Sequence, residues 1–150
     1  MSDDEIKFTP WVEPGFWRCA EGTPPVELSR SLGIPPEHAL ELRAAGWEEE
    51  LRAFTDLERA FAFETPWGYD WHAAGDRLSD FRTAHPRFLV VIRELPASAE
   101  GRKIVAEAAL AIGTEFPSEK KQCVVLEGWP SDRVDVPRDP GRPAIPVRDL

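Results

Sequence analysis

The chain has 150 residues, with 27 acidic and 18 basic side chains, and therefore a formal net charge of −9 at pH 7. This charge opposes binding to nucleic acid and to anionic membranes and favours basic protein partners, and the sequence lacks the concentrated basic patch that direct DNA or RNA binding needs. A hydrophobic content of 42 % with six tryptophans indicates a folded domain with flanking segments.

The cysteine count and the length of the apolar runs narrow the class of protein further. Cys19 and Cys123 form neither a disulfide framework nor a metal-ligand pattern, and we expect two reduced, buried thiols. The chain begins Met-Ser-Asp-Asp-Glu, without the basic and apolar regions of a signal peptide. The longest apolar runs, 88–92 and 108–112, are too short to span a membrane. We therefore expect a soluble, cytoplasmic protein.

Residues 1–38 are rich in proline and tryptophan, which predicts an irregular N-terminal extension. The repeated prolines argue against a long helix or a central strand, but the aromatic side chains indicate that the segment packs on the domain. Within it we expect a short strand near residues 6–9 or 17–19, and one or two helical turns in residues 26–32 before Gly33.

The next segment contains a strand and an ambiguous helix. Residues 38–43 predict a strand with Leu40 and Leu42 on one face. Apolar residues then recur at helical spacing and allow one long helix; these are Trp47, Leu51, Phe54, Leu57 and Phe61. Thr55 and Glu58, however, match a capping box. We therefore favour a separate helix from Asp56 to about Phe63, preceded by a turn or a short strand.

Residues 63–81 join an aromatic turn to an amphipathic helix. Pro66 and Gly68 favour a turn, and Asp70 can cap the following helix by accepting a bond from a backbone N–H. The predicted inner stripe is Trp71, Ala74, Leu78 and Phe81. The predicted outer positions are His72, Asp76, Ser79 and Asp80. An aromatic loop that leads into an acidic helix face predicts a binding edge.

The remaining elements predict an α/β fold. Residues 87–93 are apolar on both faces, as expected for the middle of a parallel sheet covered on each side. A helix over 99–112, ended by Gly113, and a strand over 122–126 follow. The order predicts a small parallel β-sheet of about three strands flanked by helices. Residues 129–150 predict an extended, Pro-rich C-terminal tail.

Residues 67–78 read Trp-Gly-Tyr-Asp-Trp-His-Ala-Ala-Gly-Asp-Arg-Leu. This run resembles the signature of the barstar-like family, in which an aromatic and a glycine precede an Asp-Ala-Leu triplet and a second Asp. The resemblance covers residues 38–128, and the segments 1–38 and 129–150 flank it. It implies a barstar-like fold for the middle of the chain.

The resemblance also implies a function, namely inhibition of a basic, barnase-like ribonuclease or a related toxin by an immunity protein or antitoxin. Such an inhibitor is not an enzyme, needs no cofactor or metal, and acts as a monomer in a 1:1 complex. The implied partner-binding residues are Trp67, Gly68, Tyr69, Asp70, His72, Ala73, Asp76, Asp80 and Glu107. Asp76 matches the second Asp of the signature, whereas His72 stands where the first Asp is usual. Glu107 is the nearest candidate for an acid from the later helix.

Other functions remain open on sequence grounds. A barstar-fold adaptor with a non-nuclease partner is the main alternative. His72 with Asp76 could form a base and its orienting carboxylate, or His72 could share a metal with His85, but the chain lacks an activated nucleophile and a phosphate-binding loop. The simpler interpretation of Asp76 is a solvated helix residue. For Trp67 and Tyr69 it is local packing of the turn. Trp71 is expected in the core, because it lies on the apolar stripe.

Overall fold

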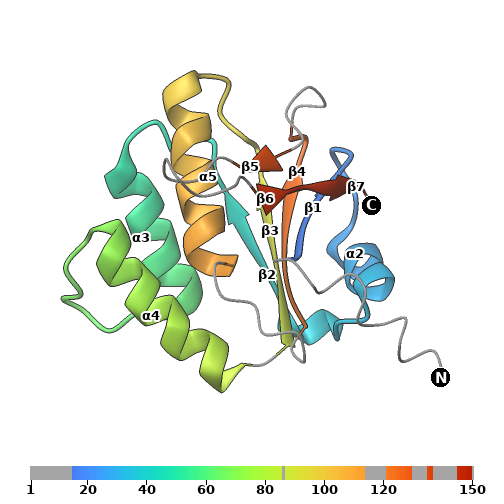
Figure 1. The fold of residues 1–150 in the computed structure, drawn as a ribbon, viewed down its shortest axis with the longest axis horizontal. Helices are drawn as coiled ribbons and strands as arrows, with labels where there is room; N and C mark the ends of the chain where they lie inside the picture. The colour runs from blue at the N-terminus through green and yellow to red at the C-terminus, as the bar shows by residue number, and fades with distance from the viewer. Residues whose placement is uncertain (1–14, 86, 114–120, 130–134, 137–144, 150) are drawn as a thin grey trace.

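The computed structural model describes residues 15–85, 87–113, 121–129, 135–136 and 145–149. Its centre is a sheet with the strand order β2-β3-β4-β1-β7, in which every neighbouring pair is parallel (Figure 1). The strands are β1 (Gly15–Cys19), β2 (Ala39–Arg43), β3 (Arg87–Arg93), β4 (Lys121–Glu127) and β7 (Arg148–Asp149). Two short strands, β5 (Asp135–Val136) and β6 (Ile145–Pro146), form a separate antiparallel pair.

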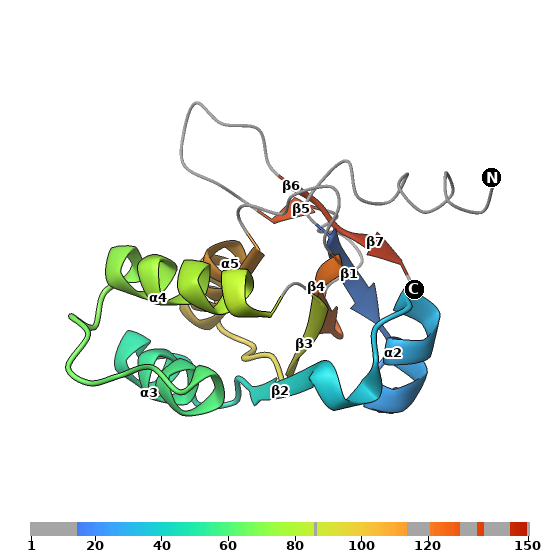
Figure 2. The ribbon, with the colours of Figure 1, turned by 90° about the horizontal axis from the view of Figure 1, so that it is seen from below.

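Helices cover both faces of this sheet. The helices α3 (Glu50–Phe61), α4 (Trp71–Ala84) and α5 (Ala99–Gly113) lie on one face, and α2 (Pro25–Leu32) lies on the other (Figure 2). A single 3₁₀ turn, η2 (Pro36–His38), precedes β2. The predicted α/β fold with a parallel sheet between helices is therefore confirmed, and the sheet gains β1 and the short edge strand β7.

The apolar run in β3 follows from this two-sided cover. Val90 and Ile92 pack with the three-helix side, whereas Leu89 and Val91 pack with Leu28 of α2. Side chains alternate between the faces of a strand, so a strand covered on both sides is apolar throughout. The strands expected at 38–43, 87–93 and 122–126, and the helices expected at 26–32 and 99–112, match the observed elements within a residue or two.

The described part of the N-terminal segment belongs to the sheet. β1 pairs with β4 on one side and β7 on the other, and Phe16 is fully buried in the larger core. The expected strand at 17–19 lies within β1, and the one at 6–9 lies outside the described residues. The prolines do not prevent an internal strand because β1 lies between Pro14 and Pro24. In the tail, Val147 is buried beside β7.

The favoured boundary of the first long helix was wrong. α3 is one helix that begins at Glu50, and Thr55 lies inside it, where its hydroxyl donates to the Leu51 carbonyl at 2.9 Å. Thr55 therefore does not cap a helix, and a threonine inside a helix commonly makes this bond to the preceding turn. Burial of the apolar stripe along Phe54, Leu57 and Phe61 stabilises the continuous helix.

Two further properties of the described residues concern the cysteine thiols and the lengths of the helices. Both cysteines are free, with Cys123 buried and Cys19 half-buried. Burial and the charge of Glu127 raise the pKa of Cys19, against the hydrogen bond with Thr23 and the charge of Arg93. None of the described helices combines the length and the apolar character that a bilayer crossing requires.

Candidate functional site

Three tryptophan side chains, one before α3, one in the loop between α3 and α4, and one at the start of α4, donate hydrogen bonds to α3. Each of three indole Nε1–H groups donates to a carboxylate of α3. The bonds run from Trp47 to Asp56 at 2.8 Å, from Trp67 to Glu58 at 2.8 Å, and from Trp71 to Glu50 at 2.7 Å. Hydrogen bonds to charged acceptors are stronger than neutral ones. The carboxylates of Glu58 and Glu50 therefore hold the loop to α3 at Trp67 and at its end, Trp71.

Glu58 holds two aromatic residues of the loop at once. Its Oε1 accepts from Trp67 and also from the Tyr69 hydroxyl at 3.0 Å. This hydrogen bond, with smaller contributions from desolvation and the carboxylate charge, raises the pKa of Tyr69. The sequence assigned Glu58 to a helix cap, and its role in the loop had no local signal.

Trp67 and Tyr69 differ in accessibility. Trp67 is 5 % exposed, and its ring makes edge contacts with Phe54 and Phe63 at centroid distances of 5.5 and 5.1 Å. Tyr69 is 41 % exposed and has a φ of 49°, a conformation that costs free energy for a residue other than glycine. Trp67 thus packs the loop, and Tyr69 is an exposed aromatic side chain of the loop.

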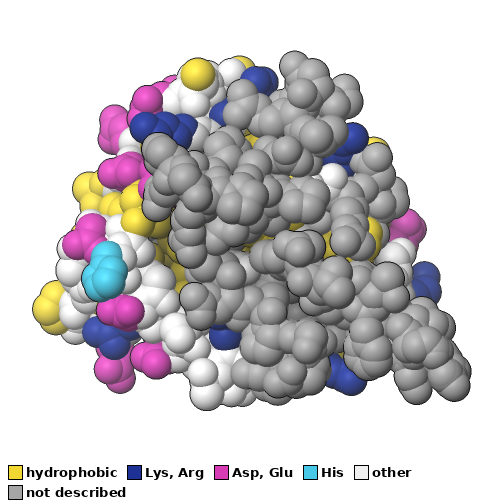
Figure 3. Space-filling view, viewed as in Figure 1, with side chains coloured by type: hydrophobic (Ala, Val, Ile, Leu, Met, Phe, Trp, Pro, Cys, Tyr) yellow, Lys and Arg dark blue, Asp and Glu magenta, His cyan; other side chains and the backbone are white. Residues whose placement is uncertain are grey.

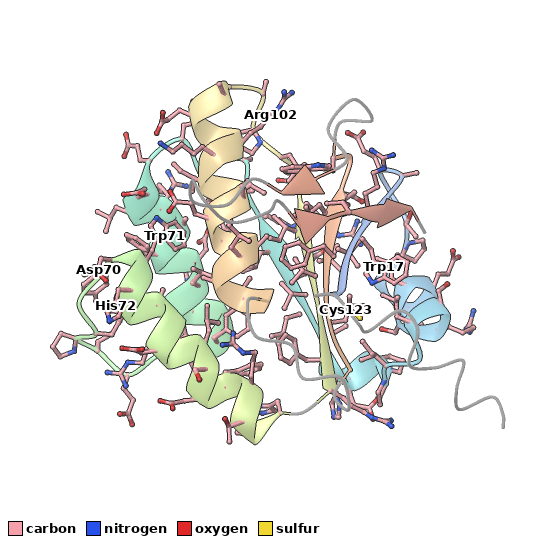
Figure 4. All side chains as sticks on the ribbon, in the orientation of Figure 1. Trp17, Asp70, Trp71, His72, Arg102 and Cys123 are labelled. Atoms are coloured by element: carbon pink, nitrogen blue, oxygen red, sulfur yellow. The ribbon has the colours of Figure 1, made fainter. Side chains whose placement is uncertain are left out.

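The start of α4 is as the sequence predicts. The Asp70 Oδ1 accepts from the backbone N–H of Ala73 at 2.7 Å, which caps the helix. On the inner stripe Ala74 and Leu78 are buried, and Trp71 and Phe81 are half-buried. Figure 4 shows Asp70 and His72 on the outer side of α4 and Trp71 between α4 and α3.

Gly68 provides a test of the loop geometry. Its φ is +100°, and a Cβ there would lie 3.1 Å from the Ala73 Cβ. We expect Gly68→Ala to lower the free energy of unfolding by about 1–3 kcal/mol because of backbone strain. Gly75, inside α4, has no atom within 4 Å of an added Cβ. Gly75→Ala should therefore raise the free energy of unfolding by about 0.5–1 kcal/mol. Urea unfolding of both variants checks these opposite signs; equal effects would contradict the described loop.

The outer face of α4 carries the remaining candidates. The side chains of His72 and Asp76 are 92 % and 76 % exposed, and His72 Nε2 lies 4.0 Å from Asp76 Oδ2. Asp80 is exposed one turn further on, and Ala73 is half-buried. Figure 3 shows acidic side chains along this side of the molecule around a histidine, with some basic side chains between them. The structure therefore gathers the α4 candidates on one exposed surface.

A hollow of about 350 Å³ adjoins this surface, between the end of α3, the loop and α4. Aromatic rings form part of it, and charged side chains of both signs reach it. Its lining residues are Phe61, Ala62, Phe63, Glu64, Arg77, Asp80 and Phe81.

Two residues lie elsewhere than the candidate surface. Glu107 is half-buried on α5, a different helix from the other candidates. Arg82, on the same helix as Asp76, is buried and donates from Nη1 to the carbonyls of Ala111 and Ile112 at 3.0 and 2.8 Å. A cation at these carbonyls is favourable because the C-terminus of a helix carries partial negative charge.

The geometry favours neither of the two other sites considered from the sequence. These are the metal site shared by His72 and His85, and the catalytic pair of His72 as a base with Asp76. His72 and His85 are separated by the length of α4, about 20 Å at 1.5 Å per residue. Among the described residues no group of three or more His, Cys, Asp or Glu side chains could hold a metal ion. The His72–Asp76 pair lies on an open surface and lacks the burial that tunes catalytic groups.

Comparisons of the chain with protein-family models, with curated proteins and with solved structures find no match.

Proposed function

We propose that this protein is a cytoplasmic inhibitor, an immunity protein or antitoxin, that blocks the active site of a basic ribonuclease in a 1:1 complex. The resemblance of residues 67–78 to the barstar-like signature suggests the function. The observation that carries it is the pair of exposed carboxylates, Asp76 and Asp80, one turn apart on α4. The exposed Tyr69 precedes them on a loop fixed by Glu58.

The physical chemistry of a ribonuclease site supports this assignment. Such a site binds the phosphates of RNA with cationic side chains, and carboxylates on a rigid helix can form the same charge-assisted hydrogen bonds. The net charge of −9 increases the rate of association with a basic partner. The hollow beside Asp80 adds aromatic surface and a second carboxylate, Glu64, against one cation, Arg77, and this balance suits a basic side chain.

The proposal is tested by recovering the partner and measuring inhibition. Tagged protein is used to capture partners from its native lysate at low salt, and a bound ribonuclease is identified by mass spectrometry and purified. We expect Asp76→Asn to weaken inhibition by about 2 kcal/mol or more, which is about 30-fold in Kd. Glu100→Gln, which removes the same charge from the exposed first turn of α5, should leave inhibition unchanged. Equal inhibition by wild type and Asp76→Asn would refute the assignment.

A second candidate is a barstar-fold adaptor for a non-nuclease protein. His72 favours it, because an imidazole stands where the barstar-like signature has its first carboxylate. Capture of a partner without ribonuclease activity, in a complex that Asp76→Asn weakens, would support the adaptor over the inhibitor.

A further inference from the structure

The opposite face of the sheet carries a second concave feature. A crevice of about 320 Å³ lies at the carboxyl ends of β2, β3 and β4, beside residues 22–24, which connect β1 to α2. Charged side chains line it: Glu41, Arg43, Arg93, Glu94 and Glu127. None of these residues belongs to the candidate surface on α4.

The alternation of side chains along the strands explains why these charges meet. Arg93 has the same parity as Val91 in β3, and Glu127 has the same parity as Val125 in β4. Val91 and Val125 pack under α2, so Arg93 and Glu127 extend the α2 face towards the carboxyl ends of the strands. α2 has only eight residues, and the strand ends next to it are lined by charge instead of apolar contacts.

The crevice lies at the edge of the sheet where the parallel strands have their carboxyl ends. The chain leaves β1 towards α2 on one face, whereas it leaves β2 and β3 towards α3 and α5 on the other face (Figure 2). β4 lies between β1 and β3, so these connections do not leave adjacent strands. The crevice nevertheless lies outside the carboxyl ends of the strands, the side of an open α/β sheet on which ligands bind.

Buried charge forms the floor of the crevice. Arg93 is 6 % exposed and Glu127 is 7 % exposed, and Arg93 Nη1 donates to Glu127. Arg93 Nη2 donates to the Thr23 carbonyl at 2.7 Å, and Glu127 also accepts from the Gly22 N–H at 2.8 Å. Desolvating two ions is costly, and apolar residues of similar size often stabilise a fold as well or better. Buried ionic groups in a cleft are therefore candidates for a role in binding.

The charge balance selects the kind of ligand. Three carboxylates against two guanidinium groups leave one net negative charge. The arginines face acceptors of the protein: Arg43 donates to Glu94 and to Glu41 Oε1, and Arg93 Nε lies 2.5 Å from Glu41 Oε2. An anion would meet carboxylates here, whereas the half-exposed Glu94 offers a carboxylate to a cation. The described residues provide no metal-binding cluster.

We propose that this crevice binds a small organic cation, a molecule carrying a primary amine or a guanidinium group, through the carboxylates of Glu94, Glu41 and Glu127. The volume of about 320 Å³ is at the lower end of the range for small-molecule pockets. The cationic group of the ligand replaces Arg43 as the ion-pair partner of Glu94 at the mouth of the crevice. The buried Arg93–Glu127 pair stays intact at its floor. This site is independent of the proposed ribonuclease inhibition.

The test uses agmatine, which carries both cationic groups, and glutarate as an anionic control, each titrated into the ¹⁵N-labelled full chain. We expect agmatine to cause saturable shifts of the Gly22, Thr23 and Glu94 amides, with no saturation by glutarate. Glu94→Gln should weaken agmatine binding about tenfold or more, because a charged acceptor is lost. Glu100→Gln removes the same charge elsewhere and should bind agmatine as the wild type does.

Three outcomes would overturn the proposal. These are the absence of saturable agmatine binding, equal affinity of wild type and Glu94→Gln, and shifts that map to Asp76 and Asp80 on α4. The last would identify a cation held by the acidic helix face. Inhibition of a ribonuclease by Glu94→Gln at wild-type strength would leave the proposed function standing whichever way the titration ends.

Discussion

Replacing Arg93 with methionine is expected to lower the free energy of unfolding by about 3–5 kcal/mol. The guanidinium group is buried, donates to Glu127 and Thr23, and lies beside Glu41. Methionine fills similar volume but leaves the buried Glu127 carboxylate without its cation. Urea unfolding at neutral pH, followed by tryptophan fluorescence and far-UV circular dichroism, gives the difference.

Two further variants separate charge burial from packing. The double variant Arg93→Met with Glu127→Leu should recover most of the loss, because it removes both buried ions together. Arg43→Met, at an exposed ion pair with Glu94, should lower the free energy of unfolding far less than Arg93→Met does, because solvent screens exposed ion pairs. A single Arg93→Met variant as stable as Arg43→Met would show that the Arg93–Glu127 pair is solvated, and would remove the buried floor from the crevice.

The elements that the sequence predicted well are those with a local signal. The apolar run of β3 and the cap at Asp70 each depend on neighbouring residues, and the structure has them at the expected positions. The helix α5 includes Gly113 as its last described residue, so the predicted stop there stays a prediction. β1 is different, because its partner strand lies far along the chain, with Gly15 opposite Cys123. Non-local pairing of this kind leaves little trace in a short segment, and the prolines around it favoured irregular chain.

The residues of the candidate site also divide into those with a local sequence signal and those without one. Helical periodicity predicted that His72, Asp76 and Asp80 would be exposed, and they are. It could not predict that Glu58 accepts bonds from the loop, since that depends on how the chain returns to α3. The crevice did have a signal: Arg93 and Glu127 each end an apolar strand, and the carboxyl ends of parallel strands lie together.

Replacing Glu58 with alanine is expected to lower the free energy of unfolding by about 2–3 kcal/mol. One carboxylate oxygen accepts both from the buried Trp67 indole and from the Tyr69 hydroxyl. Without it the indole N–H stays buried and loses its charged acceptor, which costs more than an average hydrogen bond. Urea unfolding measures the loss. Faster hydrogen exchange of the Trp67 Nε1–H, followed by ¹H–¹⁵N spectra, locates it in the loop.

Glu64→Ala is the matched control, because Glu64 is an exposed carboxylate of the same loop region and its removal should change stability by no more than about 0.5 kcal/mol. Glu58→Gln keeps an oxygen acceptor without the charge, so its stability should lie between wild type and Glu58→Ala. If Glu58→Ala behaves like Glu64→Ala, the loop is held by packing of Trp67 against Phe54 and Phe63 alone. The orientation of Tyr69 would then have to come from its backbone, and α3 would not preset the loop that the proposed inhibitor uses.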